Sequence, residues 1–292
     1  MDKNLPKNPE WTAMPCVPVV TQIVTPLIGR LFVGQETCRS EEWMNTQITF
    51  NGAVLTAAQK LRQVPYLVKP LFAPFVRDVR ILLQCLLIAR RLLTPVITAR
   101  SLGRAVPTAK RPEDLLQFVM EGSELENPPT SMPRQAEQAL IISFGGNSAI
   151  SSATAHILYD LATYPSHIEP LREEVNAIWD ELDGHLTRQS LSRMVKLDSF
   201  MKESQRLNPA NQSTINRVMR ADYTLSNGLH LPKGVRLAVP SSPVSLDPNV
   251  WENPERFDGF RFSRLRASRP ENANRFQFPT PSSKSLDFGS GK

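Results

Sequence analysis

The sequence predicts a mainly helical fold with a small β portion. Three observations predict it: apolar residues recur at helical spacing through most of residues 19–207, strand-like alternation follows, and proline, serine and arginine dominate after residue 240. With 292 residues and 41% hydrophobic content, the chain is long enough to bury a core. We therefore expect one domain over residues 1–292, helix-rich over residues 15–208, with a β-hairpin and meander-like loops over residues 209–292.

Helical periodicity predicts most of the elements in the first part of the chain. Pro95 falls inside one long apolar segment and is expected to kink or end it. Prolines 65, 70 and 74 are expected to hold a loop just before that segment. The predicted helices cover residues 19–32, 41–64, 78–99, 112–120, 134–163, 165–179 and 188–207.

The pattern changes after Pro209. Residues 223–231 alternate apolar and polar around Asn227–Gly228, and Asn-Gly favours a hairpin because both turn positions need a positive φ. A further strand is predicted over residues 235–239. From Pro240 onwards the composition indicates loop with one short helix.

The net charge of +6 does not select a function, because nucleic acid, an anionic membrane and an acidic protein would all attract it. Basic residues gather between Arg77 and Arg111, as a solvated helix face or as a contact with membrane headgroups or a negatively charged partner. No motif indicates nucleic-acid binding, and we expect no nucleic-acid partner.

The cysteines, Cys16, Cys38 and Cys85, are scattered and show neither disulfide nor metal-site spacing, so we expect inert thiols in a reducing compartment. Met1–Val20 is polar and proline-rich, unlike a signal peptide. The apolar run Ile81–Ile88 is short compared with the roughly 20 residues of a membrane span. We expect no segment of this chain to cross a bilayer.

Three motifs carry the functional analysis. Glu203 and Arg206 lie three apart on a predicted helix, a spacing that most often stabilises a helix surface by a few tenths of a kcal/mol. Some 40 residues later comes Asp247–Phe262, which contains Pro254-Glu255-Arg256-Phe257 and Arg261-Phe262. The third motif is Phe288-Gly289-Ser290-Gly291-Lys292; it is not a phosphate-binding loop, because Leu286 stands where that loop needs glycine.

In this order the three motifs resemble the cytochrome P450 family, in the form found in fungal secondary metabolism and similar to ent-kaurene oxidases. Segments 32–43, 157–162 and 167–174 strengthen the resemblance. It covers nearly the whole chain and implies an incomplete cytochrome P450 fold, truncated at both ends, from the middle helices through the loop before the haem cysteine.

The resemblance assigns a structural role to the first two motifs. It implies a buried ion network in which Glu203 lies between Arg206 and a second arginine, with Arg261 the better match and Arg256 the next. Such a carboxylate can be fully hydrogen-bonded, and the network would hold the loop beneath the haem.

The resemblance also implies a haem that faces Gly145, Gly146, Phe288 and Gly291. The axial cysteine is expected three residues beyond Lys292, so no metal ligand is expected in this chain. Electrons would come from NADPH through a cytochrome P450 reductase, and the substrate would be a small apolar natural product. The family works at the endoplasmic reticulum membrane; because the family's anchor is absent from this sequence, the location stays open between that membrane and the cytoplasm.

The long predicted helix departs from the family pattern at one position. The threonine that activates oxygen corresponds to Ala149, and Ser148, Ser151 or Ser152 could replace it only if the helix is locally overwound. The two glycines fit a haem or close helix packing equally well.

Two hypotheses remain open from the sequence. As a family assignment, the chain represents a monooxygenase of fungal natural-product biosynthesis, of terpenoids for example. Alternatively, the polypeptide as given is a non-catalytic remnant that acts at most as an interaction or membrane-surface protein. Because the haem-ligating cysteine is absent from the sequence as given, we expect this polypeptide by itself to be inactive.

Overall fold

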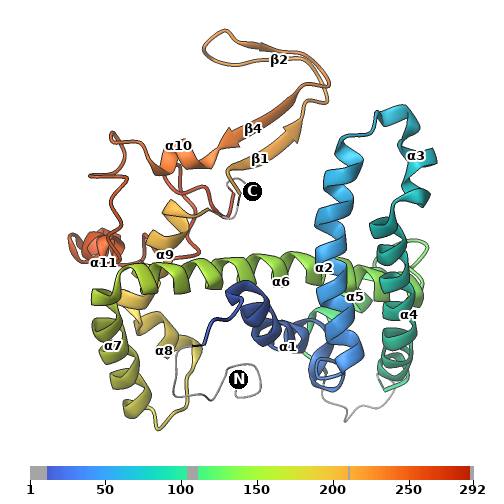
Figure 1. The fold of residues 1–292 in the computed structure, drawn as a ribbon, viewed down its shortest axis with the longest axis horizontal. Helices are drawn as coiled ribbons and strands as arrows, with labels where there is room; N and C mark the ends of the chain where they lie inside the picture. Colours follow the sequence, from blue (N-terminus) through green and yellow to red (C-terminus); the bar gives the residue numbers. More distant parts are fainter. Residues whose placement is uncertain (1–11, 104–110, 210, 290–292) are drawn as a thin grey trace. The chain divides into compact units, whose positions relative to one another are not determined.

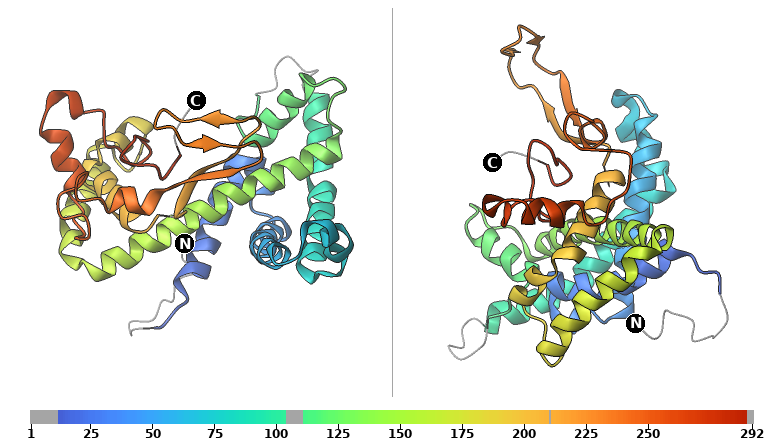
Figure 2. Two further views of the ribbon diagram at one scale, coloured as in Figure 1. Left: turned by 90° about the horizontal axis from the view of Figure 1, so that it is seen from above. Right: turned by 90° about the vertical axis from the view of Figure 1, so that its left-hand side faces the viewer.

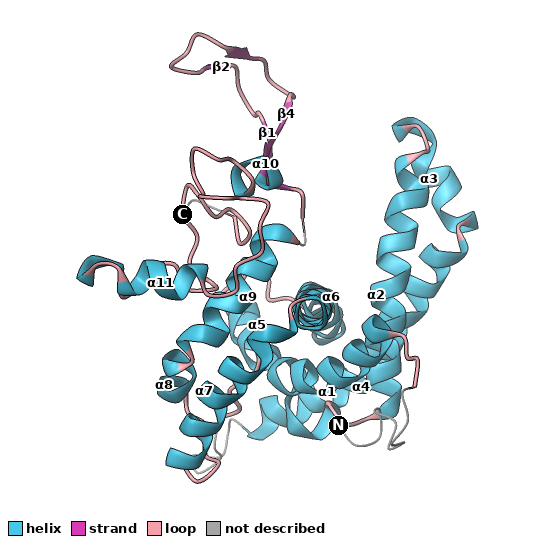
Figure 3. Cartoon of the chain, turned by 60° about the vertical axis from the view of Figure 1, so that its left-hand side comes forward, coloured by secondary structure: helices cyan, strands magenta, loops and turns pink. Residues whose placement is uncertain are grey.

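The computed structural model describes residues 12–103, 111–209 and 211–289. The chain divides into two compact units, Met1–Ser152 and Ala153–Lys292 (Figure 1). Helices make up most of the described residues, and the strands lie in the second unit (Figure 3). The prediction of a mainly helical fold with a small β portion is confirmed.

All described secondary-structure elements of the first unit are helices. The unit ends within the long helix α6 (Met132–Thr163). In Figure 1, α2 and α4 run side by side and are joined by the short helices around α3. The other elements are α1 (Cys16–Thr37), α2 (Glu41–Arg62), η1 (Tyr66–Val68), α3 (Lys69–Phe72), η2 (Ala73–Phe75), α4 (Arg77–Gly103) and α5 (Leu115–Glu124).

Local chemistry sets where these helices begin and how they pack. Ser40 caps α2, since its side chain accepts a hydrogen bond from the backbone N–H of Trp43 at 3.4 Å. One buried apolar cluster then joins the helices: Val33, Trp43, Phe50, Cys85, Ala89, Leu93, Ile97, Leu116, Met120, Ala136, Ala139 and Leu140. This cluster is the core of the first unit.

Gly34 bends α1 near its end. Its φ of 82° lies in the left-handed region, and a Cβ there would come within 2.7 Å of Asp114 and 2.9 Å of Arg100. Those two side chains form a bidentate ion pair, with both N–O distances at 2.7 Å. Only glycine therefore fits beneath this pair.

The second unit follows from the end of α6. Its helices are η3 (Pro165–His167), α7 (Ile168–Glu181), α8 (Arg188–Arg193), α9 (Val195–Leu207), α10 (Ser241–Ser245), α11 (Arg261–Ala267) and η4 (Pro270–Asn272). Its apolar core gathers around Leu171, Phe200 and Phe257. Phe200 is fully buried and lies edge-on to Phe257, with ring centroids 5.1 Å apart.

Two small antiparallel sheets complete this unit (Figure 2). β2 (Tyr223–Thr224) pairs with β3 (His230–Leu231), which confirms the predicted hairpin. The predicted turn geometry is wrong, because residues 225–229 connect the strands and, of Asn227 and Gly228, Gly228 alone has a positive φ. β1 (Ser213–Val218) pairs with β4 (Arg236–Pro240), with an irregular register between Thr214 and Arg217. The sequence analysis predicted β4 but not β1.

Several predicted boundaries are wrong. Pro95 does not end α4, because Leu93 and Ile97 on either side are buried in the core and their packing offsets the lost backbone bond. The segment before α4 contains η1, α3 and η2 rather than only loop. The helix expected over 188–207 is two helices that meet at Met194, and the region after Pro240 holds α10 and α11 rather than one helix.

Among the described residues, two helices are long and apolar enough to cross a membrane, whereas the sequence analysis found no such segment. They are α1 and α4, and this finding rests on length and composition alone. Each also contributes buried residues to the first unit, among them Ile28 of α1 and Ala89 of α4. Core helices of water-soluble proteins satisfy the same criterion, so it does not identify a span.

Candidate functional site

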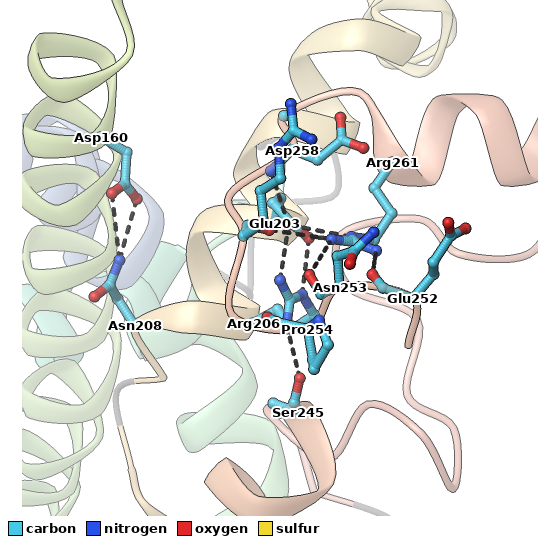
Figure 4. Close-up of polar contacts among 12 residues, drawn as sticks. Asp160, Glu203, Arg206, Asn208, Ser245, Glu252, Asn253, Pro254, Asp258 and Arg261 are labelled. Atoms are coloured by element: carbon cyan, nitrogen blue, oxygen red, sulfur yellow. Dashed lines mark hydrogen bonds and ion pairs between the residues drawn. The ribbon is translucent and has the colours of Figure 1, made fainter. Parts of the chain in front are cut away.

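The centre of the second unit is a buried carboxylate on α9. Glu203 is fully buried, and the guanidinium group of Arg206, one turn later, donates two parallel hydrogen bonds of 2.8 Å each to its carboxylate. Nε of Arg261, at the start of α11, donates to both oxygens of Glu203 at 3.1 and 3.2 Å. Figure 4 shows the carboxylate lying between the two guanidinium groups.

The same arginines hold the loop between α10 and α11. Arg206 donates to the carbonyls of Ser245 at 2.7 Å and Pro254 at 2.6 Å. Arg261 donates to the carbonyl of Glu252 at 2.6 Å, and the backbone N–H of Asp258 donates to Glu203 at 3.0 Å. Buried ion pairs are stable only when their remaining bonding capacity is satisfied, and these carbonyls satisfy it. The network therefore ties the whole loop to α9.

The structure distinguishes Arg261 from Arg256, which the sequence analysis named as the first and second candidates for the partner of Glu203. Arg261 contacts Glu203, whereas Arg256 is exposed and offers only its backbone carbonyl, to Arg261 at 3.1 Å. Both arginines line a pocket with Trp251 and Lys284, so it is the contact with Glu203 that distinguishes them. Arg261 is the first residue of α11 and is buried, whereas Arg256 lies in the preceding loop and is exposed.

The two glycines of α6 have different surroundings in the first unit. A Cβ on Gly146 would lie 2.7 Å from the ring of Phe32, so close helix packing accounts for Gly146. A Cβ on Gly145 would meet nothing within 4 Å, and Gly145 and Ala149 are both exposed. Only Gly145 therefore leaves an open helix face.

The candidate replacement hydroxyls lie elsewhere on α6. Ser151 is buried, and its hydroxyl donates to Oδ1 of Asn147 at 3.4 Å, while the amide of Asn147 donates to Thr25 of α1 at 3.1 Å. Two residues along a helix correspond to about 200° of rotation, so Ser151 points away from the face of Ala149. Ser148 and Ser152 line a pocket between α1, α2 and α6. No irregular turn brings Ser151 to the open face, because α6 is continuous.

The remaining predicted site residues lie at the end of the chain. Phe288 is 55% exposed and stacks edge-on with Phe278, with ring centroids 5.5 Å apart. Gly291 and Lys292 lie outside the described residues. Cys85 is buried in the core of the first unit, and burial raises the pKa of its thiol, which favours an inert residue over a thiolate ligand.

The face of α6 that contains Gly145 has open space beside the backbone. A Cβ at Gly145 would meet nothing within 4 Å, and Ala149, one turn later on the same face, adds only a methyl group. This open space is compatible with a haem, which Gly145 and Ala149 would then contact.

Comparison with known proteins identifies the family. A family model described as cytochrome P450 matches residues 5–292. The chain belongs to the cytochrome P450 family. It is 35% identical to cytochrome P450 monooxygenase AN1598 of Emericella nidulans, over 100% of this chain and 54% of that protein. It is 32% identical to ent-kaurene oxidase P450-4 of Gibberella fujikuroi, over 100% of this chain and 57% of that protein.

Solved structures agree with the fold of this cytochrome P450 chain. The retinoic acid-bound cyanobacterial CYP120A1 matches with a TM-score of 0.69 and 24% identity, over 94% of this chain and 56% of that one. A zebra fish cytochrome P450 with progesterone matches with a TM-score of 0.66, over 96% and 59%. The chain spans a little over half the length of these relatives.

Sequence reasoning missed two polar residues of α9, Asp198 and Lys202. Lys202 is 2% exposed, although lysine is among the residue types least often buried. One signal was available: Lys202 lies three or four positions from Ser199 and Arg206, so it falls on the buried face of the helix. The periodic pattern could not reveal what the ammonium group contacts.

The two glycines allow a matched test of helix packing. We expect Gly145→Ala to raise the free energy of unfolding by about 0.5–1 kcal/mol, since alanine favours helix and has open space. We expect Gly146→Ala to lower it by about 1 kcal/mol, because its methyl group would clash with Phe32. Urea unfolding followed by circular dichroism measures both. Equal effects of the two substitutions would contradict this assignment.

Asp160 gives the second unit a pH dependence. Its carboxylate accepts hydrogen bonds from the Asn208 amide at 3.2 and 3.4 Å (Figure 4). Burial raises the pKa of Asp160, although hydrogen bonding partly opposes this. A carboxyl whose pKa is raised in the folded state stabilises the fold below its unfolded pKa, and this stabilisation is lost as pH rises through the folded pKa.

We therefore expect Asp160→Asn to flatten the decline in melting temperature as pH rises from about 4. The variant should be more stable than the wild type at pH 7, because the amide has no charge to bury and can still accept from Asn208. Asp180→Asn, at an exposed position of α7, is the control and should leave the pH profile unchanged. Parallel profiles for wild type and Asp160→Asn would refute the assignment.

Proposed function

We propose that the whole protein is a haem-dependent monooxygenase of fungal natural-product biosynthesis that acts on a small apolar molecule. The Glu203–Arg206–Arg261 network is the observation that carries the proposal. Burying a carboxylate and two arginines has a large desolvation cost, and here their hydrogen bonds to five carbonyls fix the loop that would lie beneath a haem. When bound, a thiolate-ligated haem supplies the iron that activates dioxygen. NADPH would provide electrons through a reductase.

The residues of this chain would support that chemistry by binding and positioning. Gly145 and Ala149 leave room for a cofactor and oxygen beside α6, and Glu203 with its arginines holds the loop between α10 and α11. The ent-kaurene oxidases among the relatives support a terpenoid substrate as the first class to test. A mostly apolar pocket between α1, α2 and α6, with Asn147 and Ser148 in its wall, suits a molecule with few polar groups.

The test is spectroscopic. The transcript is first sequenced beyond the Lys292 codon, and the protein it encodes is then expressed with excess haem. A thiolate-type Soret band in the reduced CO difference spectrum, and a substrate-induced shift with diterpenes rather than polyketides, would support the proposal. A transcript without a cysteine loop, or a protein without that band, would overturn it.

One observation favours a second candidate, a non-catalytic member of the family. Ala149 has no hydroxyl at the position where the family pattern has threonine, and Ser151 faces away from it. In such a protein Ala149→Thr would leave product formation absent. In a monooxygenase the same substitution would raise the product formed per NADPH consumed, so this ratio separates the two candidates.

For location, we propose contact with an anionic membrane surface through the segment around α3. Its apolar side chains project into solvent, with Leu67, Leu71 and Phe75 exposed by 87%, 74% and 79%. Arg77 and Arg80 follow directly and are exposed. Apolar anchors beside cations are typical of interfacial binding, because the cations attract anionic headgroups. This segment forms the tip of the α2–α4 pair in Figure 3.

Vesicle sedimentation tests the location. We expect the protein to bind vesicles that contain anionic lipid and the double variant Leu71→Ser, Phe75→Ser to bind at least about tenfold less, given the apolar area removed. Leu125→Ser is the control, since Leu125 is 90% exposed in another part of the same unit. Equal loss with Leu125→Ser would argue against a localised contact.

A further inference from the structure

α9 holds a second loop by contacts that are separate from the Glu203 network. The ammonium group of Lys202 donates to the carbonyls of Gln277 at 2.9 Å, Thr280 at 3.2 Å and Phe278 at 3.5 Å. It also donates to the hydroxyl of Ser285 at 3.2 Å. These acceptors all belong to residues 277–285, so the hydrogen bonds of the ammonium group join α9 to that segment.

Asp198, one turn earlier on α9, binds the same segment as an acceptor, whereas Lys202 binds it as a donor. Its two carboxylate oxygens accept from the backbone N–H of Phe278 at 3.1 and 3.2 Å. Arg266 of α11 pairs with Asp198 at 3.2 Å. The peptide group between Gln277 and Phe278 is therefore held on both sides, its carbonyl by Lys202 and its N–H by Asp198.

The contacts continue toward the end of the described chain. Ser285 donates to Asp287 at 3.1 Å, and the backbones of Ser282 and Ser285 exchange two hydrogen bonds of 2.9 and 3.1 Å. Asp287 directly precedes Phe288. Residues 277–288 thus form one continuous loop whose internal bonds connect back to Lys202.

A buried ammonium is stable here because its surroundings compensate for lost water. Burial lowers the pKa of Lys202, while the nearby carboxylates of Asp287 and Asp198 oppose that shift. The ammonium also lies over the ring of Phe262, 5.5 Å from the centroid. An apolar residue of similar length would fill the same space without the desolvation cost of a buried charge. What the ammonium group adds is its hydrogen bonds to the loop carbonyls.

From these contacts we infer that Lys202, with Asp198, is a positioning residue that fixes the conformation of residues 277–288. The inference rests on the proposed function for its purpose, since the cytochrome P450 resemblance makes Phe288 the start of the haem-binding loop. In that case α9 positions both loops with different residues: Glu203 and Arg206 hold residues 245–261, and Asp198 and Lys202 hold residues 277–288.

Hydrogen–deuterium exchange in the whole protein tests this inference without haem. In Lys202→Met, which preserves length and removes the donors, we expect amides of residues 277–288 to exchange at least about tenfold faster, because the loop carbonyls lose the ammonium group that holds the segment on α9. Amides of residues 245–261 should stay within about twofold of wild type, because their own arginines remain.

Two further variants sharpen the test. Lys284→Met removes an exposed lysine from the same loop and should leave exchange unchanged. Ser285→Ala removes one acceptor of Lys202 and the donor to Asp287, and should raise exchange a few-fold over residues 282–288, which keeps the inference testable if Lys202→Met does not fold. Unchanged exchange in residues 277–288, or an equal rise in both loops, would overturn it.

A haem-bound measurement separates this inference from the proposed function. As the pH is moved away from neutrality, we expect the thiolate-type Soret band of the reduced CO complex to be lost after a smaller pH change in Lys202→Met than in Lys284→Met. If wild type shows no such band, the proposed function fails, while the exchange data still decide whether Lys202 holds the loop. If wild type shows the band and Lys202→Met exchanges like wild type, only the role of Lys202 is refuted.

Discussion

Glu203→Gln is expected to lower the free energy of unfolding of the second unit by about 3–5 kcal/mol, since it leaves two buried arginines without a counter-charge. Arg206 is 3% exposed and Arg261 is 9% exposed, so neither can recover its lost partner from water. The glutamine amide would also place an N–H group against one guanidinium. The loop of residues 245–261 should detach first, because its carbonyls are held by those arginines.

Denaturant unfolding monitored by circular dichroism measures this effect. Hydrogen–deuterium exchange over residues 245–261, which include the buried Trp251, reports the detachment of the loop. Glu255→Gln, at an exposed position of the same loop, is the control and should change stability by less than about 0.5 kcal/mol. A loss below about 1 kcal/mol in Glu203→Gln would show that the network contributes little.

Arg261→Met should cost about 3 kcal/mol or more, whereas Arg256→Met should cost less than about 0.5 kcal/mol. Arg261 donates to Glu203 and to the carbonyls of Glu252, Asn253 and Arg256. Methionine would leave these part-buried carbonyls without that donor, and would leave the buried Glu203 with Arg206 as its one ion-pair partner in the network. Arg256 is exposed and its side chain lies in a solvent-accessible pocket.

The same unfolding experiment compares the two arginine variants. They differ by five positions in one loop and remove the same chemical group, so composition cannot explain a difference between them. Melting temperatures that fall equally would mean that the charge of the loop, rather than the contact with Glu203, sets its stability. A larger loss in Arg256→Met would falsify the placement of Arg261.

Local sequence signals were sufficient for the longest helices and for one hairpin. The periodicity of residues 134–163 and the Asn227–Gly228 pair depend on neighbours within a few positions, so they could be recognised without the fold. Pro95 and Met194 could not. At Pro95 tertiary packing overrides a helix breaker, and at Met194 a helix ends without any proline or glycine.

The candidate site was predictable as a set of residue types but not as a set of contacts. Glu203 and Arg206 share a helix, so their pairing follows from spacing alone. Arg261 and Arg256 both come some 50 residues later, and the choice between them depends on which side chain turns inward at the start of α11. Lys202 had no motif of its own, because its partners are backbone carbonyls that any sequence could supply.

By itself the sequence determined the mainly helical fold, the cytochrome P450 family and the Glu203–Arg206 pair, since each follows from residue types at fixed spacing. Only the tertiary structure decided that Gly146 serves packing while Gly145 leaves α6 open, that Ser151 faces away from Ala149, and that Lys202 holds residues 277–285. The physical reason is the same in each case. Burial and hydrogen-bond partners are set by segments distant in sequence, and no local pattern records which of them come together.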